Sequence, residues 1–245
     1  DKKLPIFDQA FFNISKLMAV ISFRYIKGFD VDSFSDNIKF YFPITFYFHD
    51  SSLAFFSNGR QLKSCFDFPS QPRSLFQILK PNKLSPPLIF SFYVNYQPVC
   101  PLTFSNTQIK ILRFYRLSNT FYRTNIPTFL DLPQNITANI NSNINTLTLN
   151  GYGEITLNRR IINPDVFNFT RSYWFEIAIY KIERGIFKSL KNTKLIKFDI
   201  RYWRKLAHKG IDWIYDLNSD VRVDLNDSVL IREYFKNDSD VRIYL

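Results

Sequence analysis

Large apolar side chains occupy every second position from Ile38 to Phe48. The members of this phase are Ile38, Phe40, Phe42, Ile44, Phe46 and Phe48. Alternation with a period of two is typical of a strand with one buried face, whereas a helix would spread these side chains around its circumference. We therefore predict a strand over 38–48 whose Phe side chains point into a core.

The same periodicity recurs along the rest of the chain. It predicts further strands at 62–68, 90–96, 109–117, 173–182 and 195–203, with shorter β-like pieces at 211–217 and 221–231. Asn58-Gly59 and Asn150-Gly151 each lie between apolar runs. An Asn-Gly pair favours a two-residue hairpin because a type I′ turn needs positive φ at both central residues. We therefore predict one hairpin at each pair.

One segment has helical spacing instead. Its apolar residues, at Phe7, Phe11, Ile14, Met18 and Ile21, step by alternate fours and threes, which predicts a helix over 7–21. We find no internal repeat and no regular succession of strand and helix. The pattern predicts an all-β protein, an antiparallel β-sandwich or jelly roll with an N-terminal helix or arm and an extended C-terminal segment. The predicted divisions are an arm over 1–35, the sandwich over 36–217 and an extended arm over 218–245.

Charge is unevenly distributed along the chain. The net charge is +11, and the stretch 181–209 holds ten Lys or Arg residues against Glu183 and Asp199. After Ile211 acidic residues dominate. Cations and aromatic rings together can bind nucleic acid or an acidic partner, although an ordinary solvated strand face explains the same pattern equally well. The residues of this predicted basic patch are Lys181, Arg184, Lys188, Lys191, Lys194, Lys197, Arg201, Trp203, Arg204, Lys205 and Lys209.

Two cysteines, Cys65 and Cys100, allow one disulfide at most. Two separate buried thiols are the favoured interpretation, since Cys is often buried, and a disulfide between them is the alternative. Asn-x-Ser/Thr sequons begin at Asn13, Asn135, Asn168, Asn226 and Asn237, and they weakly favour a secretory route.

Recognisable catalytic and cofactor-binding motifs are missing from the sequence. The two histidines, His49 and His208, are far apart, and neither an HExxH nor a CxxC spacing occurs. GxGxxG, Walker A and GxSxG loops are also absent. No apolar run reaches the roughly 20 residues that a transmembrane helix needs. We therefore predict no enzymatic activity, no cofactor, no metal and no membrane span.

The β-rich, proline-punctuated pattern over roughly residues 36–205 resembles, in type, the jelly-roll capsid proteins of picorna-like small RNA viruses. The chain does not begin with Met, so we expect that a leader was removed or that the chain was cut from a longer precursor; the resemblance implies cleavage from a polyprotein. The resemblance implies a structural subunit of an icosahedral virion, with other capsid subunits as partners and genomic RNA inside. Two alternatives stay open: an organelle-encoded ribosomal protein of a protist, and a secreted or surface β-sandwich used for adhesion or binding.

Overall fold

The computed structural model describes most of the chain from Val20 onward. The described residues are 20–30, 45–52, 54–57, 60–67, 88–95, 98–105, 107–120, 123–132, 140, 142–199, 203–225 and 243–244. Residues 7–19 of the helix predicted over 7–21, the first part of the strand predicted at 38–48 and most of the predicted C-terminal arm lie outside these ranges. The last two residues of that predicted helix, Val20 and Ile21, begin a strand, β1 (Val20–Arg24), so the prediction is wrong there.

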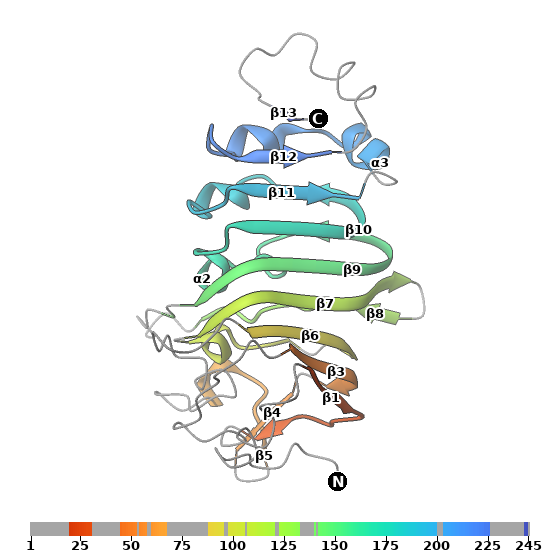
Figure 1. Ribbon diagram of the computed structural model, residues 1–245, viewed down its shortest axis with the longest axis vertical. Coiled ribbons are helices and arrows are strands. Elements are labelled where there is room, and N and C mark those ends of the chain that lie inside the picture. Colours follow the sequence, from red (N-terminus) through yellow and green to blue (C-terminus); the bar gives the residue numbers. More distant parts are fainter. Residues whose placement is uncertain are drawn as a thin grey trace.

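One large sheet of parallel strands dominates the molecule (Figure 1). Its strands follow the order β1-β3-β6-β7-β9-β10-β11-β12-β13, and each neighbouring pair along this path is parallel. The bounds are β1 Val20–Arg24, β3 Thr45–Ser52, β6 Leu88–Asn95, β7 Gln108–Thr120, β9 Asn143–Leu157, β10 Ser172–Ile182, β11 Leu195–Phe198, β12 Arg222–Asp224 and β13 Ile243–Tyr244. The prediction of a mostly β protein is confirmed.

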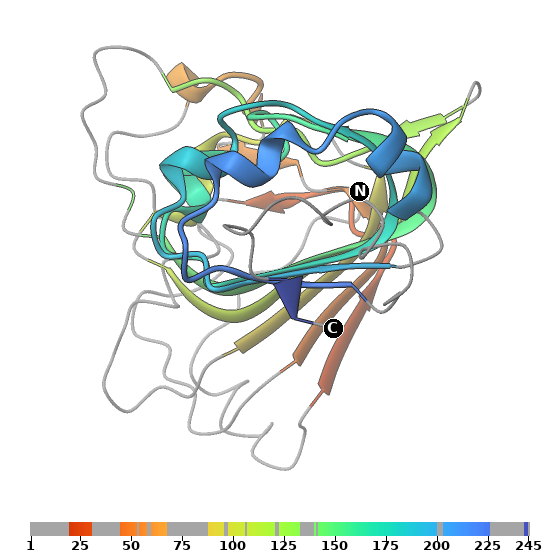
Figure 2. The same cartoon turned by 90° about the horizontal axis from the view of Figure 1, so that it is seen from above.

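The predicted antiparallel sandwich is wrong for this sheet. Residues alternate in the same way in parallel and antiparallel strands, and the lack of a regular succession of strand and helix favoured the antiparallel arrangement. Parallel neighbours need a connection of about a dozen residues or more, but that connection need not be a long helix. Here the chain returns through short helical turns on the side opposite the strands (Figure 2). They are η4 Pro101–Phe104, α2 Pro164–Phe167, η5 Phe187–Ser189, α3 Trp203–His208 and η7 Asp212–Asp216.

The remaining strands are short and lie beside the main sheet. β8 Arg123–Asn125 pairs antiparallel with β7. A small sheet contains β2 Phe29–Asp30, β4 Phe55–Ser57 and β5 Arg60–Gln61, next to the turn η2 Cys65–Asp67. Because β4 and β5 pair antiparallel across positions 58–59, the first predicted hairpin is confirmed.

The core contains side chains stacked in rows from strand to strand. In-register parallel pairing sets equivalent positions about 4.8 Å apart, so identical or similar side chains pile on one another. Phe48 stacks on Phe92 with ring centroids 4.9 Å apart, and Phe46 stacks on Phe90 at 5.0 Å. Phe46 and Phe48 are fully buried, which confirms the predicted direction of these two side chains. The other predicted core phenylalanines of that strand, Phe40 and Phe42, lie outside the described residues.

The return segments supply the opposite wall of this core. The ring of Phe129 contacts Phe104 and Phe167 edge to face, with centroids 5.8 and 5.5 Å apart. Towards the C-terminus, Trp213 of η7 packs against Phe198 of β11 at 5.4 Å. Trp213 lies in the segment 211–217, whose alternation predicted a strand, so that prediction is wrong. The predicted strand at 195–203 is also too long, because β11 ends at Phe198 and Trp203 begins α3.

The second predicted hairpin is absent because β9 continues through Asn150-Gly151 as one strand. The register between β7 and β9 shifts between Phe114 and Leu117, where Arg116 has a φ of 54°, and Gly151 then pairs with Leu117. A glycine inside a strand commonly marks such a bulge or a close backbone approach. The Asn-Gly pair therefore serves strand packing here and makes no turn.

The sheet includes strands on both sides of each predicted domain boundary, after residue 35 and after residue 217. β1 lies before residue 36 and pairs with β3. β12 lies after residue 217 and pairs with β11, and its neighbours Val221 and Leu225 are buried. Parts of both predicted arms thus belong to the same sheet as the predicted central domain.

A candidate binding face on the parallel sheet

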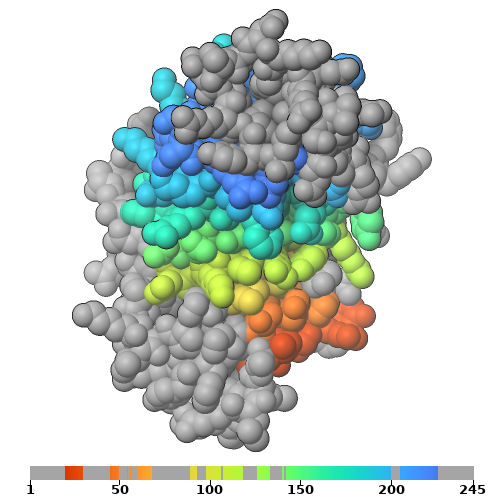
Figure 3. Space-filling view, turned by 45° about the horizontal axis from the view of Figure 1, so that its top comes forward, coloured from red at the N-terminus to blue at the C-terminus, as the bar shows by residue number. Residues whose placement is uncertain are grey.

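The face of the sheet turned away from the return segments carries side chains in register across the strands. Along one row the paired positions are Tyr47, Ser91, Arg113, Thr148, Trp174, Lys197 and Asp224. We call these seven residues the central row. Figure 3 shows the successive bands of β7 to β12 stacked on this face.

Four neighbouring members of the central row hold polar atoms that are buried and lack a hydrogen-bond partner within the described structure. These atoms are Ser91 Oγ, Arg113 Nε, Thr148 Oγ1 and Trp174 Nε1. Buried polar groups are nearly always hydrogen-bonded, because leaving one unsatisfied costs about 1–3 kcal/mol. Because these atoms have almost no accessible surface, a second molecule cannot reach them in this conformation.

Contacts along the face hold the flanking side chains in place. The ammonium of Lys197 lies 5.7 Å from the ring centroid of Trp174 and 3.3 Å from Asp224 Oδ2. One row further along the strands, Asn150 donates a hydrogen bond to Glu176 at 2.7 Å. The face thus combines an indole, cations, carboxylates and amides. Of these groups, Trp and Arg are the ones enriched in protein–protein interfaces.

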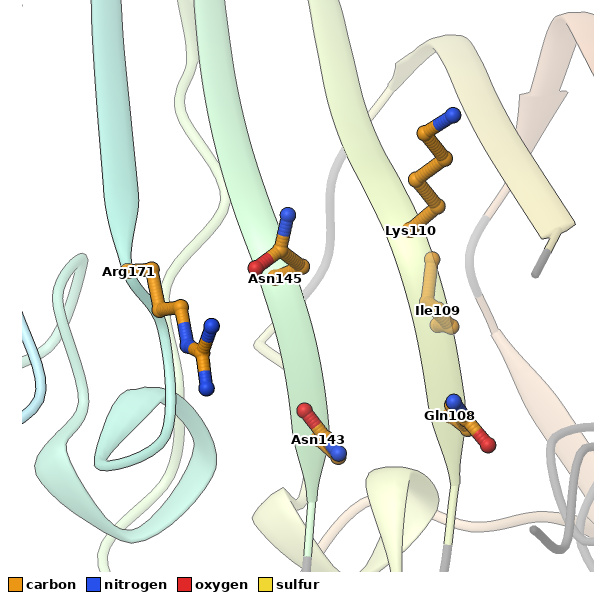
Figure 4. Close-up of a pocket in the computed structure, with 6 residues that line it drawn as sticks. All are labelled: Gln108, Ile109, Lys110, Asn143, Asn145 and Arg171. Carbon is orange, nitrogen blue, oxygen red and sulfur yellow. The ribbon is translucent and has the colours of Figure 1, made fainter.

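A hollow of about 330 Å³ opens where β7, β9 and β10 begin (Figure 4). It is lined by Gln108, Ile109, Lys110, Asn143, Asn145 and Arg171. The guanidinium of Arg171 leans from the start of β10 towards β9, from which the amides of Asn143 and Asn145 project (Figure 4). The charged groups in this lining, Lys110 and Arg171, are both cationic and exposed. Neither forms an ion pair with another residue that the structure describes.

The structure divides the predicted basic patch among several regions. Lys194 and Lys197 lie at β11 on the sheet face, where Lys194 pairs with Asp220 and Lys197 with Asp224. In α3, Lys205 pairs with Glu154 of β9.

The other members of the predicted patch lie elsewhere. Lys209 follows α3, and its ammonium sits 4.8 Å from the ring centroid of Tyr180. Lys181 is the last residue but one of β10, while Arg184, Lys188 and Lys191 lie on the segment around η5 that returns from β10 to β11. Arg201 and the side chains of Trp203 and Arg204 lie outside what the structure describes. The described cations therefore do not form one continuous surface.

Sequence reasoning missed the central row, apart from Lys197. Most of its other members occupy outward phases of the predicted strands, so alternation marked them as non-core residues. Arg113 is the exception, because it lies on the phase of Ile109 and Ile111 that the sequence indicated as inward. The structure buries Leu112 and Phe114 on either side of it instead. Only parallel register aligns them, and that register is a tertiary property.

The two cysteines form a disulfide with a Cα–Cα distance of 5.2 Å, so the favoured interpretation of two separate thiols is wrong and the alternative is correct. This bond ties η2 to the segment that leads into η4.

No family model, curated protein or solved structure matches this chain. Among the described residues, no group of three or more His, Cys, Asp or Glu side chains could together hold a metal ion. In the same part of the chain, no helix has the length and apolar character to cross a membrane.

Proposed function

We propose that this protein is a non-catalytic solenoid scaffold that binds a partner protein on the outward face of its parallel sheet. The observation that carries the proposal is the in-register parallel pairing of the strands, which places side chains from many strands on one outward face. Lys197 is exposed on this face, and Trp174 and Asp224 beside it are partly exposed, so another molecule can contact all three.

The architecture supports a binding role. Strands β6, β7, β9, β10, β11, β12 and β13 begin at residues 88, 108, 143, 172, 195, 222 and 243, so successive turns span 20 to 35 residues. In two strands the inward apolar residues follow the spacing i, i+3, i+5: Ile109, Leu112 and Phe114 in β7, and Ile144, Leu147 and Leu149 in β9. One strand and one short helical return per turn, with this spacing, resembles a leucine-rich-repeat solenoid. Solenoids of this kind present extended surfaces for partner binding.

The three functions suggested by the sequence are supported to different degrees by this architecture. The capsid-subunit hypothesis drew on an antiparallel sandwich, and the parallel sheet leaves it without a structural argument. The ribosomal hypothesis drew on positive charge, which here is divided among regions and partly neutralised by Asp220, Asp224 and Glu154. The secreted or surface binding protein fits best, since the Cys65–Cys100 disulfide favours an oxidising compartment.

Selection from a displayed peptide library tests the proposal. Binders are selected on the wild-type protein and then measured against the double variant Trp174→Ala with Lys197→Ala, which removes a partly exposed indole and an exposed ammonium from the central row. We expect about tenfold weaker binding, because truncating a central Trp of an interface commonly costs more than about 1 kcal/mol. The control is Lys188→Ala in η5, on the return side, which should leave affinity unchanged. Binders that ignore the double variant but respond to Lys188→Ala would contradict the proposal.

A further inference from the structure

We propose that Asn168 is an N-glycosylation site on the return side of the sheet and that the glycan is attached before the chain folds. Asn168, Phe169 and Thr170 form an Asn-x-Thr sequon, the acceptor sequence for such glycans in secreted proteins. The sequons that lie outside the described residues begin at Asn13, Asn135, Asn226 and Asn237. This assignment does not depend on the binding proposed for the sheet face.

The sequon lies in a tight turn on the segment that returns from β9 to β10. The amide of Thr170 donates to the carbonyl of Phe167 at 2.9 Å. Between them, Asn168 has a φ of −55° and a ψ of −32°, which are typical of the first central residue of a type I turn. The side chain of Asn192 donates to the carbonyl of Asn168 at 2.9 Å and ties this turn to the next return segment. The folded protein therefore holds the acceptor residue in a defined place.

The folded structure leaves room for a glycan at this turn. Asn168 is partly exposed, and the ring of Phe169 beside it is 45% exposed. The side-chain amide of Asn168 makes no hydrogen bond to another residue that the structure describes, so its modification breaks no such contact. A sugar attached there would also shield the ring of Phe169 from water, which is favourable for apolar surface.

The third residue of the sequon constrains when the glycan is attached. Thr170 has an exposed fraction of 0% in the folded protein. A transferase that selects Asn-x-Ser/Thr must contact this residue, because its hydroxyl distinguishes an acceptor from any other Asn. Tyr173 of β10 donates to the carbonyl of Phe167 at 3.2 Å and so fixes the turn to the start of that strand. Transfer must therefore precede the packing of β10.

The reaction needs a co-reactant that the cell supplies, an oligosaccharide linked to a lipid pyrophosphate. Nδ2 of Asn168 forms a bond to the anomeric carbon of the first sugar and releases one proton. The bond between that carbon and the pyrophosphate oxygen breaks, and the lipid pyrophosphate leaves with the bonding electrons. The Cys65–Cys100 disulfide fits the same route, because disulfides form in the lumen through which secreted chains pass.

A glycan at Asn168 would leave the sheet face clear. The helix α2 and the turn that follows it lie on the return side, opposite the outward face of the strands (Figure 2). A glycan is bulky and hydrophilic, so it keeps other proteins away from the surface that carries it. The return side would then be the solvated side of the molecule.

Expression of the full chain behind a secretory leader in animal cells tests the site. The glycan is released enzymatically in heavy-oxygen water, which turns a modified Asn into a labelled Asp that mass spectrometry locates in the peptide. We expect a glycan at Asn168 in most of the secreted wild-type protein and in Thr170→Ser, which keeps the sequon. Asn168→Gln and Thr170→Val should each abolish it. An unlabelled Asn168 peptide from secreted wild-type protein with an intact disulfide, or labelling that survives Thr170→Val, would overturn the assignment.

A second experiment tests the timing. Microsomal transferase with its lipid-linked donor is offered the folded, unglycosylated protein made in bacteria and, separately, a synthetic peptide of residues 163–175. We expect the peptide to be modified and the folded protein to stay unmodified, because only the peptide exposes Thr170. Equal modification of both would overturn the requirement that transfer precede folding. Binding of library-selected peptides to the sheet face should be the same for the glycosylated protein and for Asn168→Gln, so failure of either proposal is recognised separately.

Discussion

The backbone of Gly151 in β9 lies directly against the backbone of Leu117 in β7. A Cβ added at Gly151 would approach Leu117 O to 2.1 Å and Leu117 N to 2.5 Å. These are backbone atoms within paired strands, so they cannot turn aside as the end of a side chain could. The bulge at Arg116 therefore depends on a glycine at position 151.

We expect Gly151→Ala to destabilise the protein by at least 1–3 kcal/mol, the usual cost of overpacking a well-packed interior. Urea denaturation followed by circular dichroism measures the change. Gly210→Ala is the matched control, because position 210 has a φ of 107° but open space around the added Cβ. That variant carries conformational strain of about 1–2 kcal/mol without a clash. If Gly151→Ala lowered the free energy of unfolding less than Gly210→Ala, then β7 and β9 would be able to move apart and make room for the added methyl group.

Thr148→Val should stabilise the isolated protein. Thr148 Oγ1 is buried and, within the described structure, unpartnered, so removing it relieves a penalty of about 1 kcal/mol. Thr107→Val is the contrasting variant, since Thr107 Oγ1 donates to the carbonyl of Phe104 at 2.8 Å and its loss should cost about 1 kcal/mol. Chemical denaturation of both variants checks the opposite signs. Loss of stability in both would mean that the Thr148 hydroxyl is satisfied in solution.

The buried hydroxyl of Tyr173 predicts a loss of stability at high pH. It donates to the carbonyl of Phe167 at 3.2 Å, and burial raises the pKa of Tyr173 well above its ordinary value of 10.0. Above pH 10 the unfolded chain releases this proton while the folded protein retains it. Stability should therefore be fully present below pH 10 and fall by about 1.4 kcal/mol per pH unit above it.

Comparison with Tyr173→Phe isolates this contribution from those of other groups. The variant loses one hydrogen bond, about 1 kcal/mol at neutral pH, but should lose less stability than the wild type between pH 10 and pH 11.5. Urea midpoints across this range provide the measurement. Parallel pH profiles for the two proteins would show that Tyr173 ionises in the folded state.

The Cys65–Cys100 bond should contribute about 2–4 kcal/mol, because it closes a loop of 35 residues in the unfolded chain. The double variant Cys65→Ala with Cys100→Ala should lower the free energy of unfolding by that amount. Treating the wild type with a reductant should have a similar effect and raise its mass by two hydrogens. Free thiols that react readily in the native protein would contradict the disulfide.

Substitutions of Phe46 and Tyr47 test which side chains of β3 point into the core. Phe46 is fully buried and stacks on Phe90, whereas Tyr47 lies on the outward face beside His49, with ring centroids 5.9 Å apart. Phe46→Ala should cost about 3–5 kcal/mol, and Tyr47→Ala clearly less. Thermal denaturation of the two variants gives the order. If Tyr47→Ala were the more damaging, the register of β3 would be inverted.

The sequence determined where many of the strands lie and which residues of the regularly alternating strands face inward; in β7 the alternation failed, because Leu112 and Phe114 are buried in place of Ile111 and Tyr115. Alternation placed Phe46, Phe48 and Phe90 correctly, because burial of every second side chain is a local property of an extended chain. It also located β10 to within a residue. These features depend on neighbours within a few positions, so the order of residues alone reveals them.

The tertiary structure decided three other features. They are the direction of the strands, the position of Asn150-Gly151 inside a strand and not in a turn, and the set of residues on the proposed binding face. Alternating residues fit parallel and antiparallel neighbours equally well, and only the path of the return segments chooses between them. The central row brings together Ser91, Arg113, Thr148 and Trp174 from four strands spread over more than eighty residues. No local pattern relates such distant positions, since their alignment is set by in-register pairing and by bulges such as the one opposite Gly151.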